Sequence, residues 1–157
     1  MQFAVSATAS NPGAARSAKD NRGLFLAIAV LAIAGVVVSA VSLQRHYAKS
    51  ATAFCDVGEK FNCDIVNRSE YSSVMGIPVA GVGIVGYGIL LALATVYRSR
   101  TVTPARLLAA AAAGLGFALY LTYVEGFVLD TWCILCLSSL GLIVMITVLA
   151  GVVSARA

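Results

Sequence analysis

Charged residues are scarce in this chain of 157 residues. Lys, Arg, Asp and Glu make up 11% of the sequence, whereas hydrophobic residues make up 60%. Soluble domains carry about 25% charged residues, so a soluble fold could not cover so much apolar surface. The formal net charge is +4, but the basic residues are scattered, which argues against a nucleic-acid-binding patch. The composition therefore predicts an integral membrane protein.

Runs without charge divide the chain into four predicted membrane spans. The first, Leu24–Leu43, has 20 residues and no charge, which at about 1.5 Å per residue crosses a hydrocarbon core of roughly 30 Å. The other three are predicted at Ile77–Tyr97, Leu107–Val124 and Trp132–Val153. The Gly and Ala residues of the second and third spans favour close helix packing. The expected fold is an all-α integral membrane protein with a four-transmembrane-helix bundle.

Polar segments flank the first span. Residues 1–23 show no apolar period and are expected to form a disordered cytoplasmic tail. Gln44–Gly76 predicts a long outer loop of functional length, in which Asp64–Ser73 could form a short amphipathic helix. A rival interpretation of the first span is a cleaved signal peptide, because a Val-Ser-Ala motif at 38–40 resembles a cleavage site. The apolar run is long for such a peptide.

The distribution of basic residues predicts the orientation. The tail, the turn after the second span and the C-terminus hold seven basic residues, and the long loop holds four. The acids fall the other way, with only Asp20 on the first side. Since basic residues favour the cytoplasm, both termini are expected there and the loop is expected outside. The seven are Arg16, Lys19, Arg22, Arg98, Arg100, Arg106 and Arg156, and the four are Arg45, Lys49, Lys60 and Arg68.

Two of only four cysteines form a Cys-x-x-Cys pair, Cys133 and Cys136. The pair is expected in the first turn of the fourth span, with Asp130 or Thr131 as N-cap. Free N–H groups and the helix dipole there would stabilise a thiolate. Cys136 lies one turn deeper, where a hydrophobic two-electron acceptor dissolved in the bilayer could reach it. That acceptor is most simply a quinone.

The other two cysteines, Cys55 and Cys63, lie in the long loop. The predicted topology places all four on one side, in an oxidising compartment. A flexible loop pair could exchange disulfides with a soluble dithiol and with the membrane pair. The sequence thus predicts an electron relay from a soluble dithiol through the loop pair and the membrane pair to a quinone.

Simpler interpretations of the cysteines remain open. Cys133 and Cys136 could be two small apolar residues, and Cys55 and Cys63 could form a structural disulfide. The chain would then be a non-enzymatic membrane scaffold. Zinc binding is disfavoured because metal knuckles usually sit on turns rather than within a membrane helix, so no metal is expected. Two pairs on one side favour the relay.

Other polar and aromatic residues are weaker candidates. Ser69 could hydrogen-bond a sulfur or a quinone oxygen, or merely cap a helix. His46 is expected to be an interfacial residue rather than a proton donor. Glu125 is expected at the outer interface, in a loop over Glu125–Thr131, with proton release as a lesser option. Trp132 fits a membrane-belt residue or a cap over the redox pocket. Three tyrosines are expected to be packing or interface residues rather than ligands: Tyr87, Tyr120 and Tyr123.

Together these motifs resemble a known family. Phe54-Cys55-Asp56-Val57-Gly58, then Cys63, Ser69 and Trp132-Cys133-Ile134-Leu135-Cys136 are similar to the vitamin K epoxide reductase (VKOR) family. The resemblance covers about residues 22–155 and points to a bacterial-type homologue without a fused thioredoxin-like domain. It implies a four-helix membrane domain over residues 24–155, built around a quinone and covered by the outer loop.

The resemblance also implies a role for each cysteine. Cys55 would exchange with the soluble partner, Cys63 with Cys133, and Cys136 would face the quinone, with Ser69 at the family's loop serine. The implied partners are a quinone (ubiquinone or menaquinone) and a separate thioredoxin-fold, DsbA-like protein. The implied activity is a quinone-dependent thiol–disulfide oxidoreductase that supports disulfide formation outside the cytoplasm.

Two positions depart from the animal members of that family. Leu140 stands where they have a tyrosine, four residues after the second cysteine of the pair. Ile77-Pro78-Val79 stands near the start of the second span, where they have an asparagine. Both departures favour a plain quinone as the substrate that is reduced. Reduction of vitamin K epoxide is the alternative activity.

Overall fold

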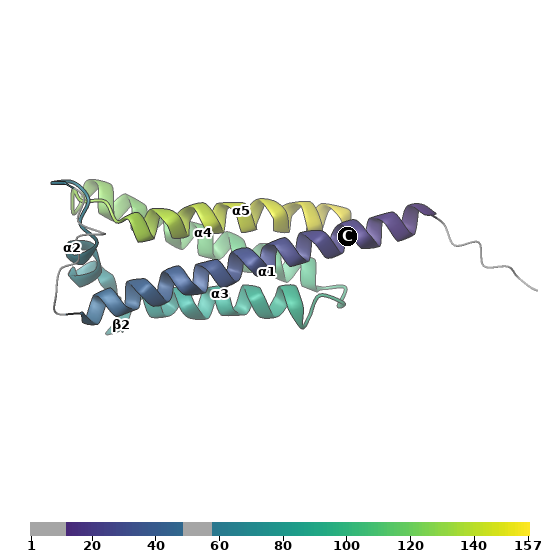
Figure 1. Cartoon of the computed structure of the whole chain (residues 1–157), viewed down its shortest axis with the longest axis horizontal. Helices are drawn as coiled ribbons and strands as arrows, with labels where there is room; N and C mark the ends of the chain where they lie inside the picture. Colours follow the sequence, from purple (N-terminus) through teal and green to yellow (C-terminus); the bar gives the residue numbers. More distant parts are fainter. Residues whose placement is uncertain (1–11, 49–57) are drawn as a thin grey trace, which may run out of the picture.

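The structure is a computed structural model that describes residues 12–48 and 58–157. Helices dominate these residues, with one small two-stranded antiparallel sheet (Figure 1). In chain order the elements are α1 (Pro12–Tyr47), α2 (Cys63–Arg68), the 3-10 helix η1 (Glu70–Ser72), β1 (Ser73–Val74), β2 (Ile77–Pro78), α3 (Val79–Thr95), α4 (Thr103–Phe127) and α5 (Ile134–Arg156).

The long helices α1, α3, α4 and α5 lie side by side in an elongated bundle, with α2 across one end (Figure 1). α1 packs on α3 and α5, and α4 packs on α5. Each helix contributes apolar side chains to the shared core, among them Ile28, Leu90, Leu107 and Ile146. This arrangement matches the expected helical membrane fold.

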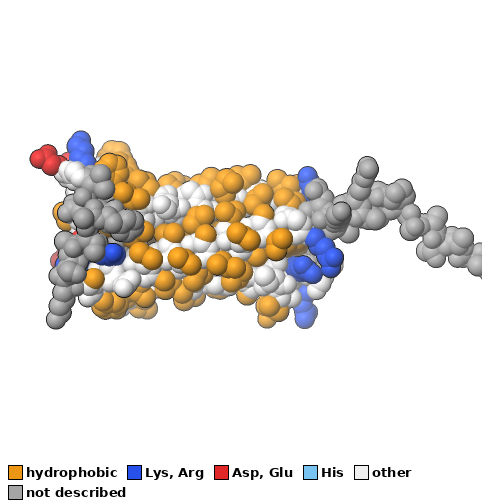
Figure 2. Space-filling model, viewed as in Figure 1, with side chains coloured by type: hydrophobic (Ala, Val, Ile, Leu, Met, Phe, Trp, Pro, Cys, Tyr) orange, Lys and Arg blue, Asp and Glu red, His pale blue; other side chains and the backbone are white. Residues whose placement is uncertain are grey.

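Among the described residues, three helices are long and apolar enough to cross a membrane: α1 from Asn21 onward, α4 and α5. α3 is apolar but shorter, with 17 residues. Apolar side chains also point outward, such as Val30 (59% exposed) and Val85 (63% exposed). Figure 2 shows hydrophobic side chains along the visible face, Lys and Arg at both ends, and acidic groups at the α2 end. A monomer in water would rarely expose such a continuous apolar surface.

The segment before α3 builds a compact cover over one end of the bundle. The Asn62 side chain accepts hydrogen bonds from the N–H groups of Asp64 (3.0 Å) and Ile65 (3.1 Å), which caps the short α2. β1 and β2 are joined by Met75 and Gly76, both at positive φ (53° and 81°). Positive φ at both central residues is the geometry of a type I′ hairpin turn. The single helix expected over Asp64–Ser73 is instead two short helices, α2 and η1, and Ser73 begins β1.

The helix boundaries correct several expectations. α1 begins at Pro12, so residues 12–23 of the expected disordered tail are helical; Ala, Arg and Lys are good helix formers and extend a helix already nucleated by the apolar span. α3 begins at Val79 rather than Ile77, because Ile77 and Pro78 pair in the hairpin. α4 continues to Phe127, past the end predicted at Val124.

Helix α5 begins at Ile134, whereas the sequence predicted a start at Trp132. The backbone of Trp132 is instead hydrogen-bonded to the loop segment, accepting at 3.2 Å from the N–H of Asn62 and donating at 2.8 Å to the carbonyl of Lys60. A residue that pairs in this extended manner cannot also take helical dihedral angles. The loop therefore sets where α5 starts.

Close packing of α1 on α3 gives a stability prediction. A Cβ added at Gly35 would lie 2.4 Å from the Tyr87 ring, so Gly35→Ala should lower the free energy of unfolding by about 1–3 kcal/mol. Gly88→Ala is the matched control, because nothing lies within 4 Å of its added Cβ. Chemical or thermal unfolding of both variants in detergent measures the difference, and equal stability would contradict this packing.

Candidate active site

Cys133 is the N-cap of α5 rather than a residue of its first turn. Its dihedral angles are extended (φ −109°, ψ 118°), and its Sγ accepts a hydrogen bond from the N–H of Cys136 at 3.4 Å. The expected caps are thus wrong. The Thr131 hydroxyl donates to the carbonyl of Leu129 instead of capping the helix. Asp130 has a positive φ of 46° and forms part of the turn before the helix. A sulfur in a capping position lies where the free N–H groups of the helix concentrate.

The two cysteines of the pair differ in setting. Both are free thiols; Cys133 is completely buried and Cys136 is half-buried. The pKa of the Cys133 thiol lies below its ordinary value, first because the Cys136 thiol hydrogen-bonds it and further because of the backbone N–H of Cys136. Burial and the negative charge of Glu125 act in the opposite direction. Cys133 is therefore the cysteine of the pair that loses its thiol proton more readily.

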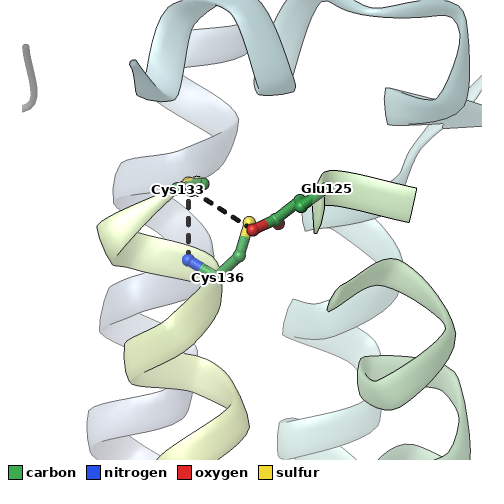
Figure 3. Close-up of side chains that lie close together, drawn as sticks. All are labelled: Glu125, Cys133 and Cys136. Carbon is green, nitrogen blue, oxygen red and sulfur yellow. Dashed lines mark hydrogen bonds between the residues drawn. The ribbon is translucent and has the colours of Figure 1, made fainter. Parts of the chain in front are cut away.

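Glu125 belongs to this site, which corrects the expectation of an interfacial loop residue. It lies in the last turn of α4, is 2% exposed, and accepts a hydrogen bond at 3.2 Å from the backbone N–H of Cys133. Figure 3 shows its carboxyl group beside the sulfur of Cys136. An acid within an otherwise apolar run was the available signal, since ionisable residues in membrane segments are usually functional.

A ligand atom of each of Glu125, Cys133 and Cys136 lies within 4.8 Å of the others. Such spacing would also suit a metal ion. Structural zinc sites use four protein ligands and catalytic ones three plus a water, and these three side chains are the one such group in the part of the chain that the structure describes. Two thiols at Cys-x-x-Cys spacing instead suit reversible disulfide formation.

Cys63 packs beside Cys133 at the other side of the pair. Cys63 is 1% exposed, is disulfide-bonded, and shares a buried cluster with Val66, Cys133 and Leu135. The Asn67 side chain spans the two cysteines, donating to the carbonyl of Cys63 at 2.9 Å and to the Sγ of Cys133 at 3.9 Å. Asn67 was not among the residues that the sequence pointed to, because nothing in its local pattern shows that it faces another helix. Cys55 lies outside the described residues.

A cavity of about 420 Å³ opens on the Cys136 side. α1, α3, α4 and α5 form its walls, and α2 and η1 contribute residues at one end. Small residues of α3 and α4 leave this space, among them Gly83, Gly86, Ala113 and Ala118. The polar and titratable side chains that line it are Ser39, Ser42, His46, Asn67, Ser69, Tyr71, Ser72, Tyr87, Glu125, Cys136 and Ser139.

The sequence matches the family model of the Vitamin K epoxide reductase family over residues 26–151. The match covers most of the chain and contains all four cysteines. The chain belongs to the vitamin K epoxide reductase family. This confirms the resemblance and, together with the apolar helices, identifies the protein as an integral membrane oxidoreductase.

The remaining candidates of this VKOR-family site take different positions. Ser69 lines the cavity, but its hydroxyl donates to the carbonyl of Val66 at 2.9 Å, which is the capping alternative. His46 also lines the cavity, with Nδ1 at 2.5 Å from the carbonyl oxygen of Asn67. Tyr87 is buried and donates to the carbonyl of Ser139 at 2.8 Å. Tyr120 and Tyr123 are exposed on the outside of α4.

Trp132 supports the start of α5 and does not line the cavity. Its ring lies against Gly126, where an added Cβ would approach it to 3.0 Å. Its backbone joins the loop next to Phe61. Within this VKOR-family site, Trp132 therefore holds the segment between α4 and α5 against the outer cover.

The Asn62 cap on α2 gives a prediction about the stability of this short helix. Asn62→Ala removes the side-chain acceptor for the two N–H groups and should destabilise α2 by about 1 kcal/mol, whereas Asn62→Asp keeps an acceptor. Hydrogen exchange of the amides of Cys63–Arg68 should accelerate in the alanine variant alone. Equal exchange in both variants would show that tertiary contacts hold α2 without its cap.

Proposed function

We propose that the protein is a quinone-dependent thiol–disulfide oxidoreductase. Electrons would pass from a soluble dithiol through Cys55 and Cys63 to Cys133 and Cys136, and from there to a quinone. The observation that carries this proposal is the placement of the membrane pair: Cys133 adjoins the buried cluster of Cys63, and Cys136 lines the apolar cavity. One pair thus faces two different reaction partners.

The first transfer would join Cys63 to Cys133. A Cys63 thiolate attacks Cys133 of the membrane disulfide, and Cys136 leaves as a thiolate. Asn67 supports this step because its amide reaches both the backbone of Cys63 and the sulfur of Cys133. Its N–H groups can stabilise charge on sulfur during the exchange.

The second transfer would take place in the cavity. Cys136 gives up an electron pair to a quinone there, and Cys133 closes the disulfide with it. The cavity volume of about 420 Å³ lies in the range of small-molecule sites, roughly 300–1,000 Å³. Its mainly apolar walls suit a lipid-soluble ring. Leu140 packs on the bundle core and does not line the cavity, so its side chain does not distinguish a plain quinone from vitamin K epoxide.

The proposed topology has four membrane spans, α3 being the shortest, with both termini in the cytoplasm. The basic side chains Arg98 and Arg100 between α3 and α4, and Arg106 in the first turn of α4, favour that end as cytoplasmic. The four cysteines would then face the outer compartment, where Cys55 exchanges with a thioredoxin-fold protein.

The cysteine roles predict distinct defects. Purified protein given a reduced thioredoxin-fold partner should reduce a ubiquinone or menaquinone analogue, and Cys136→Ala should lower turnover to the enzyme-free rate. The same variant should still accept a disulfide exchange at Cys63. Ser138→Ala, on the exposed side of α5, is the control and should keep full turnover. Quinone reduction by Cys136→Ala at the normal rate would refute the assignment.

Mixed-disulfide trapping tests the entry point. The partner thiolate attacks Cys55 of the loop disulfide and Cys63 leaves as a thiolate, so a partner variant that keeps only its attacking thiol should remain attached to Cys55, because the second partner thiol that would release it is missing. Gel analysis of the trapped species under non-reducing conditions gives the readout. Trapping at Cys133 instead would mean that the partner bypasses the loop pair.

Filling the cavity tests the quinone site. Gly86→Leu should raise the KM for quinone, because Gly86 lines the cavity and its added side chain would occupy that space. Gly88→Leu is the matched control: it lies on the same helix, meets nothing within 4 Å and does not line the cavity. Steady-state kinetics with a quinone analogue compare the two. A direct assay with vitamin K epoxide separates the alternative substrate.

A further inference from the structure

Glu125 carries an oxygen that lacks a hydrogen-bond partner in the interior. Its Oε2 accepts from the N–H of Cys133 at 3.2 Å, but its Oε1 is buried without a hydrogen-bond partner among the described residues. Burying an unpaired carboxylate oxygen is costly, and native structures rarely retain one without a functional reason.

The surroundings of Glu125 contain thiols rather than a basic partner. Its carboxyl group lines the cavity with Cys136 and lies within 4.8 Å of the sulfurs of Cys133 and Cys136 (Figure 3). No lysine or arginine lines that cavity within the described chain. The unpaired oxygen therefore lies where a thiol proton and a bound quinone would meet.

The other titratable groups around the cavity are differently placed. They come from α1 (His46), η1 (Tyr71) and α3 (Tyr87). His46 is engaged with the carbonyl of Asn67, Tyr87 donates to Ser139, and Tyr71 is exposed at the α2 end. Glu125 is the carboxylate that stands next to the reacting sulfurs.

We propose that Glu125 is the proton-transfer residue of quinone reduction, an inference that rests on the function proposed above. Cys133 and Cys136 lose two protons and an electron pair as their disulfide forms, and the quinone gains the electron pair. Glu125 accepts the thiol proton of Cys136 and gives it to the nearer quinone oxygen, which restores the carboxylate. Cys133 releases its proton to the outer aqueous side, and water at the cavity mouth supplies the second proton of the quinol.

Glu125→Gln separates this role from a structural one. The amide oxygen of glutamine can still accept the N–H of Cys133, but the side chain can no longer carry a proton. The variant should lower kcat for quinone reduction by about 10²–10⁴-fold, the usual contribution of general acid–base catalysis. Since the carboxylate is the required form, the wild-type kcat should fall as pH decreases through the pKa of Glu125, and that acid limb should vanish in Glu125→Gln.

Glu70→Gln is the matched control, because Glu70 is an exposed carboxylate at the same end of the bundle. It should keep the wild-type kcat and pH profile. A Glu125→Gln enzyme that folds and retains the kcat and acid limb of Glu70→Gln would overturn the proposal. If Glu125→Gln loses thermal stability but keeps its kcat and acid limb, Glu125 is only a structural hydrogen-bond acceptor, and the proposal is overturned as well.

Infrared difference spectroscopy supplies a readout that does not need quinone. Chemical reduction and oxidation of the Cys133–Cys136 pair should shift the carboxyl stretch of Glu125, because thiols and disulfide present different proton donors to it. The shift should be absent from Glu125→Gln and present in Glu70→Gln. If Glu125→Gln does not fold, Glu125→Asp takes its place; a carboxyl band that ignores the redox state of the pair then refutes the proposal.

Failure of this inference differs from failure of the proposed function. If the wild type reduces no quinone but passes disulfides from Cys133 to Cys63, the quinone assignment is wrong. If the wild type reduces quinone and Glu125→Gln does so equally well, only the proton-transfer role is wrong. Partner exchange through Cys63 should be normal in Glu125→Gln, because that step uses neither the cavity nor its proton carrier.

Discussion

One hydrogen bond, from the backbone N–H of Cys133 to the carboxylate of Glu125 at 3.2 Å, joins the end of α4 to the start of α5. The turn between them depends on it, together with the bond from the N–H of Thr131 to the carbonyl of Glu125 at 3.1 Å. Because the chain is anchored at both points, Cys133 takes the N-cap position and Cys136 lies one turn further on. The relative positions of both sulfurs follow from this connection.

The consequence is a redox pair with two different faces. Asn67 and the cluster around Cys63 cover Cys133 completely, whereas Cys136 borders an apolar cavity. Disulfide exchange with the cover and electron transfer to a lipid-soluble acceptor therefore have separate approaches to one pair of sulfurs. Glu125 lies on the cavity side, next to the sulfur from which a proton must leave.

Helix packing explains why there is a cavity at all. Gly35 lets α1 approach α3 until the Tyr87 ring lies over its backbone, and the Tyr87 hydroxyl ties α3 to Ser139 of α5. Between α3 and α4, by contrast, residues such as Gly86 and Ala113 line the cavity without filling it. Small residues thus serve close packing in one interface and leave a binding volume in another.

Much of the protein follows from its one-dimensional pattern. The apolar runs around Leu24–Leu43, Leu107–Val124 and Trp132–Val153 correspond to the long helices, and the cysteine motifs point to the family whose model matches residues 26–151. Both are local properties: an apolar run must satisfy its backbone as a helix in lipid, and the motif is a spacing of residues. Helix ends were less predictable, since α1 starts at Pro12 and α5 at Ile134.

The site needed the tertiary structure. The apolar run that ends before Glu125 predicts an outer loop there, yet α4 continues through it and the segment that starts α5 contacts its carboxylate. Asn67 carried no local signal, because its role depends on two cysteines from different elements. The sequence by itself determined the membrane helices, the family and the candidate thiols. Only the folded chain decided which groups surround each thiol, because that depends on contacts between residues far apart in the sequence.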